Sequence, residues 1–305
     1  MISTASIFAG QGAQAVGMGK DVEAAFPSCK ALFTKASEVL GYDLAKTCFE
    51  GPAELLTKTS VCQPAIFVVS ACCFAALRER KPTFAFAAAA GLSLGEWTAL
   101  YAAEVVSFEQ AVRILEARGR FMQEACDESP SGMITILKAP MDKVQEIAEK
   151  TGLSIANINS ADQVVYSGTK DAIAAAEAEA KAAGARPVVL QVAGGYHSRF
   201  MASAATKLEA FLANETFKSP AIPVYSNVTG KPHGNSSDEI RKAMVAQVTG
   251  TVRWMDVVSN MAAAGMTRFV EFGPGKTLSG LVKKIRPEAA VANVADMATL
   301  ETVEV

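Results

Sequence analysis

The sequence is poor in histidine: only His197 and His233 occur among its 305 residues. It has six cysteines, but no two of them have the C-x-x-C spacing that zinc sites and redox motifs use. We therefore expect no bound metal, and we expect the thiols to be reduced and mostly buried. The cysteines stand at positions 29, 48, 62, 72, 73 and 126.

The sequence also lacks an excess of charge, because 29 lysines and arginines nearly balance 31 aspartates and glutamates. No broad basic field is present to hold a nucleic-acid backbone or an anionic membrane. No unbroken apolar run has the roughly 18 residues of a membrane span, since even the stretch from Phe84 is soon interrupted by Glu96. The first residues show no secretory signal, although a removed transit peptide would leave no trace. We expect a cytoplasmic protein that binds neither nucleic acid nor membrane.

Half of the residues are hydrophobic, enough for a large core and a second, smaller unit. Three apolar runs, at 5–9, 84–90 and 267–272, end at glycine and are followed by helical periodicity. This alternation is typical of a largely parallel α/β sheet.

The middle of the chain has a different pattern. Strands are predicted at 133–137, 153–158, 163–167 and 187–192, with helices at 141–150 and 171–183. The order βαββαβ is that of a ferredoxin-like unit. We therefore expect an inserted subdomain at 129–193 within a larger catalytic domain made of 1–128 and 194–305.

A G-x-S-x-G pattern, Gly91-Leu92-Ser93-Leu94-Gly95, lies between the second apolar run and a helical stretch at 96–103. This is the context of a nucleophile elbow, in which a sharp turn exposes the serine oxygen near the free N–H groups of a helix. The alternative is an ordinary glycine-rich turn with Ser93 as a helix N-cap.

A nucleophilic serine needs a general base, and the chain offers only two histidines. His233 lies in a polar loop with Gly234, Asn235 and serines, where we expect it to be exposed. His197 follows a glycine-rich segment where the inserted unit should return to the large domain. His197 is the better candidate, with a packed histidine of no chemical role as the alternative.

Two polar residues fall on faces that should be apolar. In the helical pattern at 108–128, Arg118 shares a stripe with Leu115 and Met122. A buried arginine needs a partner, which is either a protein carboxylate or, as we favour, the carboxylate of a ligand. Gln247 lies in register with Met244 in a later helix, and a buried glutamine also needs partners, structural or catalytic.

The chain resembles the malonyl-CoA:acyl carrier protein transacylases of fatty-acid synthesis and, more loosely, the acyltransferase domains of polyketide synthases. The resemblance runs almost from end to end. The segments that carry it are Phe8-Ala9-Gly10-Gln11-Gly12-Ala13-Gln14, Gly91-Leu92-Ser93-Leu94-Gly95-Glu96, Arg118-Gly119 with Met122-Gln123, Gly194-Gly195-Tyr196-His197-Ser198 and Glu271-Phe272-Gly273-Pro274-Gly275.

The resemblance implies an α/β-hydrolase-like domain with a ferredoxin-like insertion and a cleft between them. It implies ping-pong transfer of a malonyl group from malonyl-CoA, through an acyl-serine, to acyl carrier protein. Coenzyme A thioester is then a substrate, and no bound cofactor is expected. We expect a monomer.

Matching positions imply roles for individual residues. Ser93 would be the nucleophile, His197 its base in a dyad without a carboxylate, and Arg118 the binder of the malonyl carboxylate. The backbone N–H groups of Gln11 and Leu94 would form the oxyanion hole.

Further positions are implied around these. Gln247 would help to orient His197, and Met122 and Tyr196 would contact the substrate. Asn157 and Asn159 match a segment that faces the cleft in the family, with ordinary strand-end amides as the alternative reading.

Two departures from the family pattern stand out. Leu92 occupies the position before the serine where most relatives have histidine. Tyr196 precedes the base where many malonyl-specific relatives have phenylalanine, and its bulk should disfavour a branched methylmalonyl group. Because the base is elsewhere, we expect the chemistry to survive the first departure.

Other functions fit less well. The glycines near Gly10 lack the third glycine of a dinucleotide fingerprint, and Gly275-Lys276-Thr277 lacks the first glycine of a P-loop, since Val270 stands there. A serine thioesterase or esterase is the stronger rival, because elbow, base and oxyanion hole serve water as well as a thiol. A non-catalytic binding protein would be expected to have lost one of the site residues.

Overall fold

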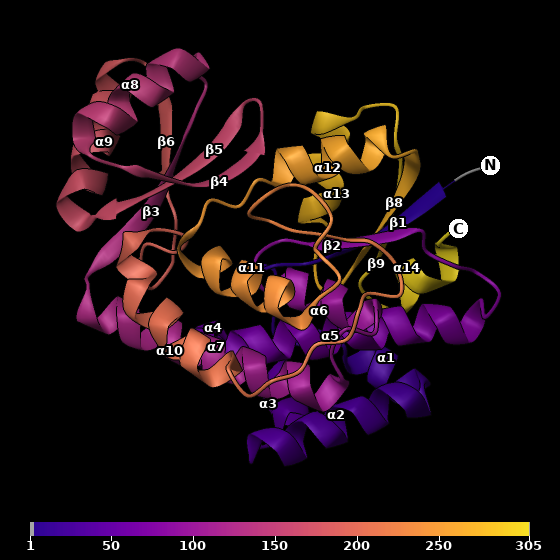
Figure 1. The fold of residues 1–305 in the computed structure, drawn as a ribbon. Helices are drawn as coiled ribbons and strands as arrows, with labels where there is room; N and C mark the ends of the chain where they lie inside the picture. The colour runs from indigo at the N-terminus through magenta and orange to yellow at the C-terminus, as the bar shows by residue number, and fades with distance from the viewer. Residues whose placement is uncertain (1–2, 305) are drawn as a thin grey trace.

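The computed structural model describes residues 3–304 and contains two sheets. The larger sheet has five parallel strands in the order β7-β2-β1-β8-β9 (Figure 1). The predicted α/β class with a mainly parallel sheet is confirmed. The strands are β1 Ser3–Phe8, β2 Ala88–Gly91, β7 Val224–Tyr225, β8 Met266–Phe272 and β9 Ala290–Val294.

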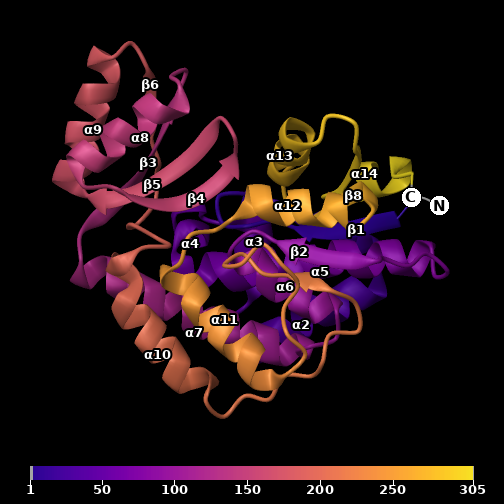
Figure 2. The same ribbon diagram turned by 45° about the horizontal axis from the view of Figure 1, so that its top comes forward.

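Helices cover both faces of the parallel sheet (Figure 2). Successive side chains of a strand point to opposite faces, so Ile7 packs with α12 and α13 while Phe8 faces the larger core on the other side. α12 is Trp254–Ala263 and α13 is Thr277–Ile285. The other face carries α1 Lys20–Ala25, α2 Pro27–Leu40, α3 Leu44–Glu50, α4 Ala53–Thr57, α5 Thr59–Arg80, α6 Leu94–Ala102, α7 Phe108–Glu128, α10 Ala202–Leu212, α11 Ser237–Thr249 and α14 Met297–Thr302.

The second sheet is antiparallel, with the order β4-β5-β3-β6. Helices α8 and α9 pack on one of its faces around a separate hydrophobic core (Figure 1). Its elements follow the predicted βαββαβ order. They are β3 Ser131–Leu137, α8 Met141–Thr151, β4 Ser154–Ser160, β5 Gln163–Thr169, α9 Lys170–Ala182 and β6 Arg186–Val189. We propose that this unit is the inserted subdomain, 129–193, and that the rest of the chain forms the catalytic domain.

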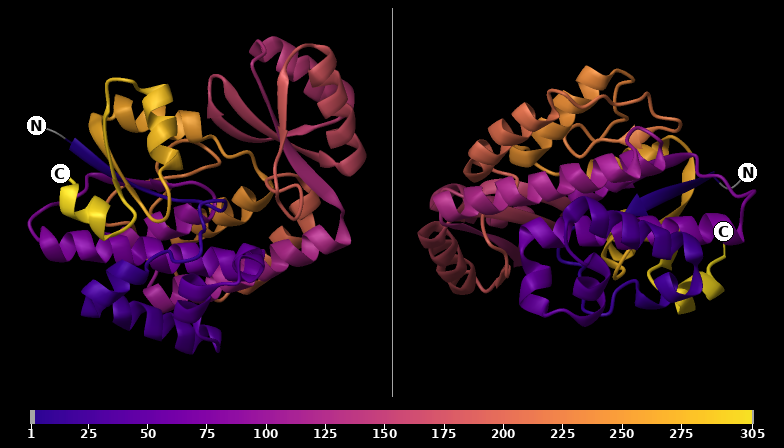
Figure 3. Two further views of the ribbon diagram at one scale, coloured as in Figure 1. Left: turned by 180° about the vertical axis from the view of Figure 1, so that it is seen from behind. Right: turned by 90° about the horizontal axis from the view of Figure 1, so that it is seen from below.

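The small sheet is tied to the large unit along β4. Val252, just before α12, exchanges backbone hydrogen bonds with Ala156 and Ile158, both at 2.8 Å. Lys284 of α13 donates to the Gln163 side chain at the β4–β5 turn. The start of β1 and helix α14 lie on the far side of the molecule from the small sheet (Figure 3). The two units therefore meet along one seam. After β6 the chain returns to the large unit through the short helix η1, Arg199–Met201.

Helix α5 qualifies the expectation of no membrane span. By length and composition alone this 22-residue helix is apolar enough to cross a membrane, with a mean hydropathy of 1.9. Most of that window, 83%, is buried inside the fold, as in the core helix of a globular protein. In the sequence, Gln63, Pro64 and Ser70 interrupt the apolar run of this helix, so it does not stand out as a membrane span.

One predicted strand is partly wrong. The apolar run at 84–90 was expected to be extended throughout, but β2 begins only at Ala88. Phe84 and Phe86 instead form an aromatic cluster with Phe74 and Phe272. The phenylalanines before Ala88 therefore pack in an aromatic cluster without forming a strand.

Close backbone packing fixes the turn after β2. A Cβ on Gly91 would overlap the backbone of Gly95, and a Cβ on Gly95 would overlap the carbonyl oxygen of Phe8 on β1. Glycine is therefore required at both positions because helix α6 starts directly against the strands.

We predict that Gly95→Ala lowers the free energy of unfolding by about 3 kcal/mol, because the added methyl group has no space beside Phe8. Gly280→Ala is the matched control: it lies in α13 with open space around its Cα, and should stabilise by about 0.5 kcal/mol. Urea unfolding followed by circular dichroism measures both. Equal stability of the two variants would contradict the packing argument.

Candidate active site

Ser93 stands at the turn between β2 and α6 with a positive φ of 55°. A non-glycine residue in this region is strained by of the order of 1–3 kcal/mol, so neighbouring contacts must hold it. Asn227 provides them: its Oδ1 accepts from the Ser93 N–H at 2.7 Å, and its Nδ2 donates to the Gly91 carbonyl at 2.8 Å. The turn therefore has the conformation of a nucleophile elbow.

His197 lies in contact with this serine, with 2.8 Å between its Nε2 and the Ser93 Oγ. Its Nδ1 lies 2.9 Å from the backbone carbonyl oxygen of Gln247. A carbonyl can only accept, so Nδ1 carries the proton and Nε2 is left to accept from the serine hydroxyl. The imidazole is buried and has the tautomer that a general base needs.

The base has no carboxylate behind it. Among the described residues, the only histidine within 4.0 Å of a carboxylate is His233, not His197. The carbonyl of Gln247 fills the place that a carboxylate takes in a catalytic triad. The arrangement is thus the serine–histidine pair that the resemblance implied.

Arg118 is almost completely buried, with 1% of its surface exposed. Its guanidinium donates to Oε1 of Gln63 at 2.6 Å, to Oε1 of Gln247 at 3.0 Å and to Oγ of Ser93 at 3.2 Å. No carboxylate in residues 3–304 lies within 4.0 Å of it. The sequence left two partners open for this arginine, a protein carboxylate or a ligand carboxylate. The described residues do not supply the first.

The charges of the site act on one another through the buried interior. Burial lowers the pKa of Arg118 to about 10, so the guanidinium stays charged at neutral pH. Burial and, after it, the charge of Arg118 lower the pKa of His197 to about 4. His197 is therefore neutral, and able to accept a proton, at physiological pH.

Gln247 contacts the site through both its backbone and its side chain. Its backbone carbonyl, not its side chain, contacts His197. The side-chain Nε2 donates to the Ser93 carbonyl at 2.9 Å and to Oε2 of Glu96 at 2.6 Å, while Oε1 accepts from Arg118. The side chain therefore positions the arginine and the elbow, and the backbone orients the base.

Two backbone N–H groups are available near the serine. Leu94 is the first residue of α6, and Gln11 follows β1 in the adjacent loop. Neither N–H donates to an acceptor within the described chain. A helix N-terminus favours negative charge, so these groups suit the oxyanion hole that the resemblance implied.

The elbow opens into a cleft of about 570 Å³ between the two units. Seven of the residues predicted for the site line it. They are Gln11, Ser93, Met122, Asn157, Asn159, Tyr196 and His197. Arg118, Gln247 and Leu94 lie behind the cleft wall, where Arg118 and Gln247 reach the serine by hydrogen bonds. Oδ1 of Asn159 is buried without a partner in the described chain and is free to accept from a ligand.

Tyr196 is fixed by its hydroxyl group. The oxygen lies 2.8 Å from Oγ1 of Thr59 and accepts from Nε2 of Gln11 at 3.4 Å. Burial raises the pKa of Tyr196 to about 12, so the phenol stays neutral. Leu92 also lines the cleft.

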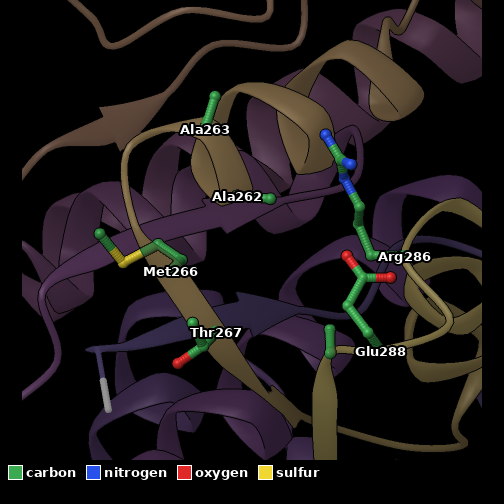
Figure 4. Close-up of a pocket in the computed structure, with 7 residues that line it drawn as sticks. Ala262, Ala263, Met266, Thr267, Arg286 and Glu288 are labelled. Carbon is green, nitrogen blue, oxygen red and sulfur yellow. The ribbon is translucent and has the colours of Figure 1, made fainter. Parts of the chain in front are cut away.

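Another pocket, of about 330 Å³, lies between the end of α12 and the start of β8 (Figure 4). Arg286 and Glu288 are its charged lining residues, and Arg286 points away from the glutamate in Figure 4. It contains no histidine or cysteine. Within residues 3–304 there is also no cluster of three or more metal-ligating side chains. The cleft at Ser93, by contrast, contains a serine paired with a histidine.

The expectation that His233 is exposed is wrong. Its side chain is 1% exposed, and Nε2 lies 2.6 Å from Oε1 of Glu96. The loop folds back on β7, with the His233 N–H bonded to the Val224 carbonyl. Polar composition predicted a surface loop, but a buried carboxylate holds this histidine inside.

Sequence reasoning missed several supporting residues. Glu96 is fully buried in the first turn of α6, three residues after Ser93, and Gln63 is a buried amide in α5. A polar residue within an otherwise apolar helix was the available signal for Gln63. Nothing local marked Asn227, whose partners lie more than 100 positions away in the chain.

Comparison with known proteins supplies the family. The model described as "Acyl transferase domain" matches residues 6–300. The malonyl CoA-acyl carrier protein transacylase of Escherichia coli K12 is 43% identical over 290 residues, covering 93% of both chains. The polyketide biosynthesis protein ThaF of Burkholderia thailandensis is 39% identical across 95% of this chain, which spans only 25% of that longer protein.

Solved structures of malonyl-transacylases have the same fold as this chain. A malonyl-transacylase solved in complex with its type II polyketide synthase acyl-carrier protein matches with a TM-score of 0.93 and 38% identity, over 98% of each chain. The likeness therefore extends over the whole described fold, including both sheets.

We predict that Arg118 adds to the effect of burial in lowering the pH at which protonation of His197 slows the reaction of Ser93. An uncharged serine reagent such as phenylmethylsulfonyl fluoride should react more slowly as the pH falls through about 4, where His197 becomes protonated. In Arg118→Met the imidazolium is no longer repelled, so the limb should move to higher pH. Inactivation rates between pH 3.5 and 8 measure this, with folding checked by circular dichroism.

Arg113→Met, an exposed change on the same helix, is the control and should leave the acidic limb in place. Superimposable profiles for Arg118→Met and the native protein would refute a role of the guanidinium in the pKa of His197.

Proposed function

Because the chain belongs to the acyl transferase family, we propose that it moves the malonyl group from malonyl-CoA to the phosphopantetheine thiol of acyl carrier protein. Relatives of nearly full length carry the name malonyl CoA-acyl carrier protein transacylase. The observation that carries the proposal is Arg118, a buried guanidinium 3.2 Å from Oγ of Ser93 with neutral protein acceptors only. A carboxylate on the acyl group completes this site.

In the first half-reaction Ser93 attacks the thioester carbonyl of malonyl-CoA. Nε2 of His197 takes the hydroxyl proton, and the carbonyl oxygen becomes an oxyanion that accepts from the N–H groups of Gln11 and Leu94. Collapse of the tetrahedral intermediate breaks the C–S bond. The proton on His197 passes to the leaving coenzyme A thiolate, and malonyl-Ser93 remains.

The second half-reaction reverses these roles. The phosphopantetheine thiol of the carrier protein enters the cleft, gives its proton to His197 and attacks the malonyl ester. Ser93 leaves as an alkoxide and takes the proton from the imidazolium. The coenzyme A that leaves and the carrier-protein group that attacks are both thiols, so one site serves donor and acceptor in turn by a ping-pong mechanism.

Arg118 accounts for the choice of acyl group. Its guanidinium now bonds to two neutral amides and a hydroxyl, which leaves its charge without a direct anionic partner. The planar fork suits bidentate capture of a carboxylate. The Tyr196 ring, held by Thr59, adds bulk beside His197 that we expect to disfavour a branched methylmalonyl group.

Cellular context follows from the same proposal. The partners are malonyl-CoA and acyl carrier protein, and the reaction needs no bound cofactor or metal because the thioester is already activated. We infer action as a monomer in the cytoplasm. All six cysteines are free and buried, as is usual in a reducing compartment.

We predict that Arg118→Ala lowers the rate of Ser93 acylation by malonyl-CoA roughly 100-fold, the loss expected for charge-assisted hydrogen bonds. Acetyl-CoA, which has no carboxylate, should be affected far less. Mass spectrometry of the acylated protein after rapid quench measures both rates. Arg113→Ala is the matched control, and equal losses with the two thioesters would remove the proposed role of Arg118.

A thioesterase would use the same site with water as the acceptor. We predict that isolated malonyl-Ser93 decays slowly in buffer and at least tenfold faster on adding carrier protein, because the acceptor thiol is the better nucleophile. Ser93→Ala should abolish labelling. Rapid loss to water, unchanged by carrier protein, would identify a hydrolase instead.

A further inference from the structure

A second histidine pairs with a buried carboxylate behind the active site. Nε2 of His233 lies 2.6 Å from Oε1 of Glu96, and the side chains are 1% and 0% exposed. A carboxylate can only accept, so Nε2 carries the proton and donates. None of the proposed catalytic steps uses this pair.

Glu96 has further donors on its other oxygen. Oε2 accepts from Nε2 of Gln247 at 2.6 Å and from the backbone N–H of Asn227 at 3.1 Å. Three donors thus hold the carboxylate in one place inside the fold. Each of them comes from a segment far from Glu96 in the chain.

The carboxylate decides which way the Gln247 amide faces. Because Nε2 of Gln247 donates to Glu96 and to the Ser93 carbonyl, its Oε1 is directed at the guanidinium of Arg118. The reversed amide would set its N–H donors against the guanidinium and its carbonyl oxygen against the carbonyl oxygen of Ser93. It would also leave the carboxylate facing a carbonyl oxygen, and such mismatches are costly when buried.

We propose that His233 is a positioning residue for malonyl capture, acting through Glu96 and Gln247 on Arg118. This rests on the proposed function of the site. His233 holds the carboxylate, the carboxylate orients the amide, and the amide holds one side of the guanidinium fork. Removing the imidazole releases one oxygen of Glu96 and lets the amide and the arginine take other positions.

The backbone of the loop places the imidazole for this role. The N–H of His233 is bonded to the Val224 carbonyl at 2.8 Å, and Pro232 forms a bridge with Tyr225. Asn227, in the same loop, both contacts Glu96 and clamps the elbow at Ser93. One loop therefore carries supports for the nucleophile and for the acyl-binding arginine.

The experiment compares malonyl-CoA with acetyl-CoA as acyl donors to Ser93 in three variants. His233→Leu removes the donor, His233→Gln offers an amide N–H in place of Nε2, and Lys231→Leu is an exposed control in the same loop. Single-turnover acylation is followed by mass spectrometry, with thermal melting of each variant. The wild-type chain is measured first.

In His233→Leu we expect the ratio of malonyl to acetyl acylation rates to fall roughly tenfold, the worth of one hydrogen bond to a charged group. His233→Gln should restore most of the ratio, and Lys231→Leu should keep all of it. A purely structural histidine would instead lower both rates together and leave the ratio unchanged. That result, or a normal ratio in a folded His233→Leu, would overturn the proposal.

If His233→Leu does not fold, His233→Asn replaces it, because the shorter amide cannot reach Glu96. The ratio should then fall in His233→Asn and recover in His233→Gln, and equal ratios in the two would refute the proposal. Failure of the wild-type chain to form malonyl-Ser93 would instead count against the proposed function itself. The two failures are thus distinguishable.

Discussion

The buried guanidinium of Arg118 is the constraint on which the active site depends. A charge taken out of water must be surrounded by correctly oriented acceptors. Here Gln63 and Gln247 supply amide oxygens and Ser93 its hydroxyl. None of these is an anion, so the cation is solvated by the protein without being neutralised by direct contact. Burial and, after it, the same charge lower the pKa of His197, which keeps the base unprotonated at physiological pH.

Two of the four non-glycine residues with positive φ in the described chain are the proposed nucleophile and its proposed base. Ser93 and His197 both have positive φ, of 55° and 53°. Such conformations persist only when the surroundings over-determine them. Asn227 holds the first, and the Gln247 carbonyl receives the imidazole of the second. The close start of α6 against β1 leaves the elbow no room to relax, so the serine oxygen stays within reach of the base.

Much of the fold could be predicted because burial repeats along the chain with the period of its secondary structure. The helices at 108–128 and 277–285 match α7 and α13 at both ends, and the βαββαβ order of the small unit is confirmed. Prediction was wrong where apolar residues did not mean strand, as at Phe84 and Phe86, and where polar residues did not mean surface, as at His233. In both cases a contact distant in the chain decided the outcome.

The sequence by itself determined the turn at Ser93 and the position of the cation Arg118 on an apolar helix face, because local spacing shows both. It also limited the general base to two candidates, because the chain has only two histidines. Only the tertiary structure decided that Arg118 reaches Ser93 without a protein carboxylate, that the backbone of Gln247 orients His197, and that His233 is buried against Glu96. The physical reason is that a side chain's hydrogen-bond partner depends on which distant segments meet it. No local pattern records that meeting.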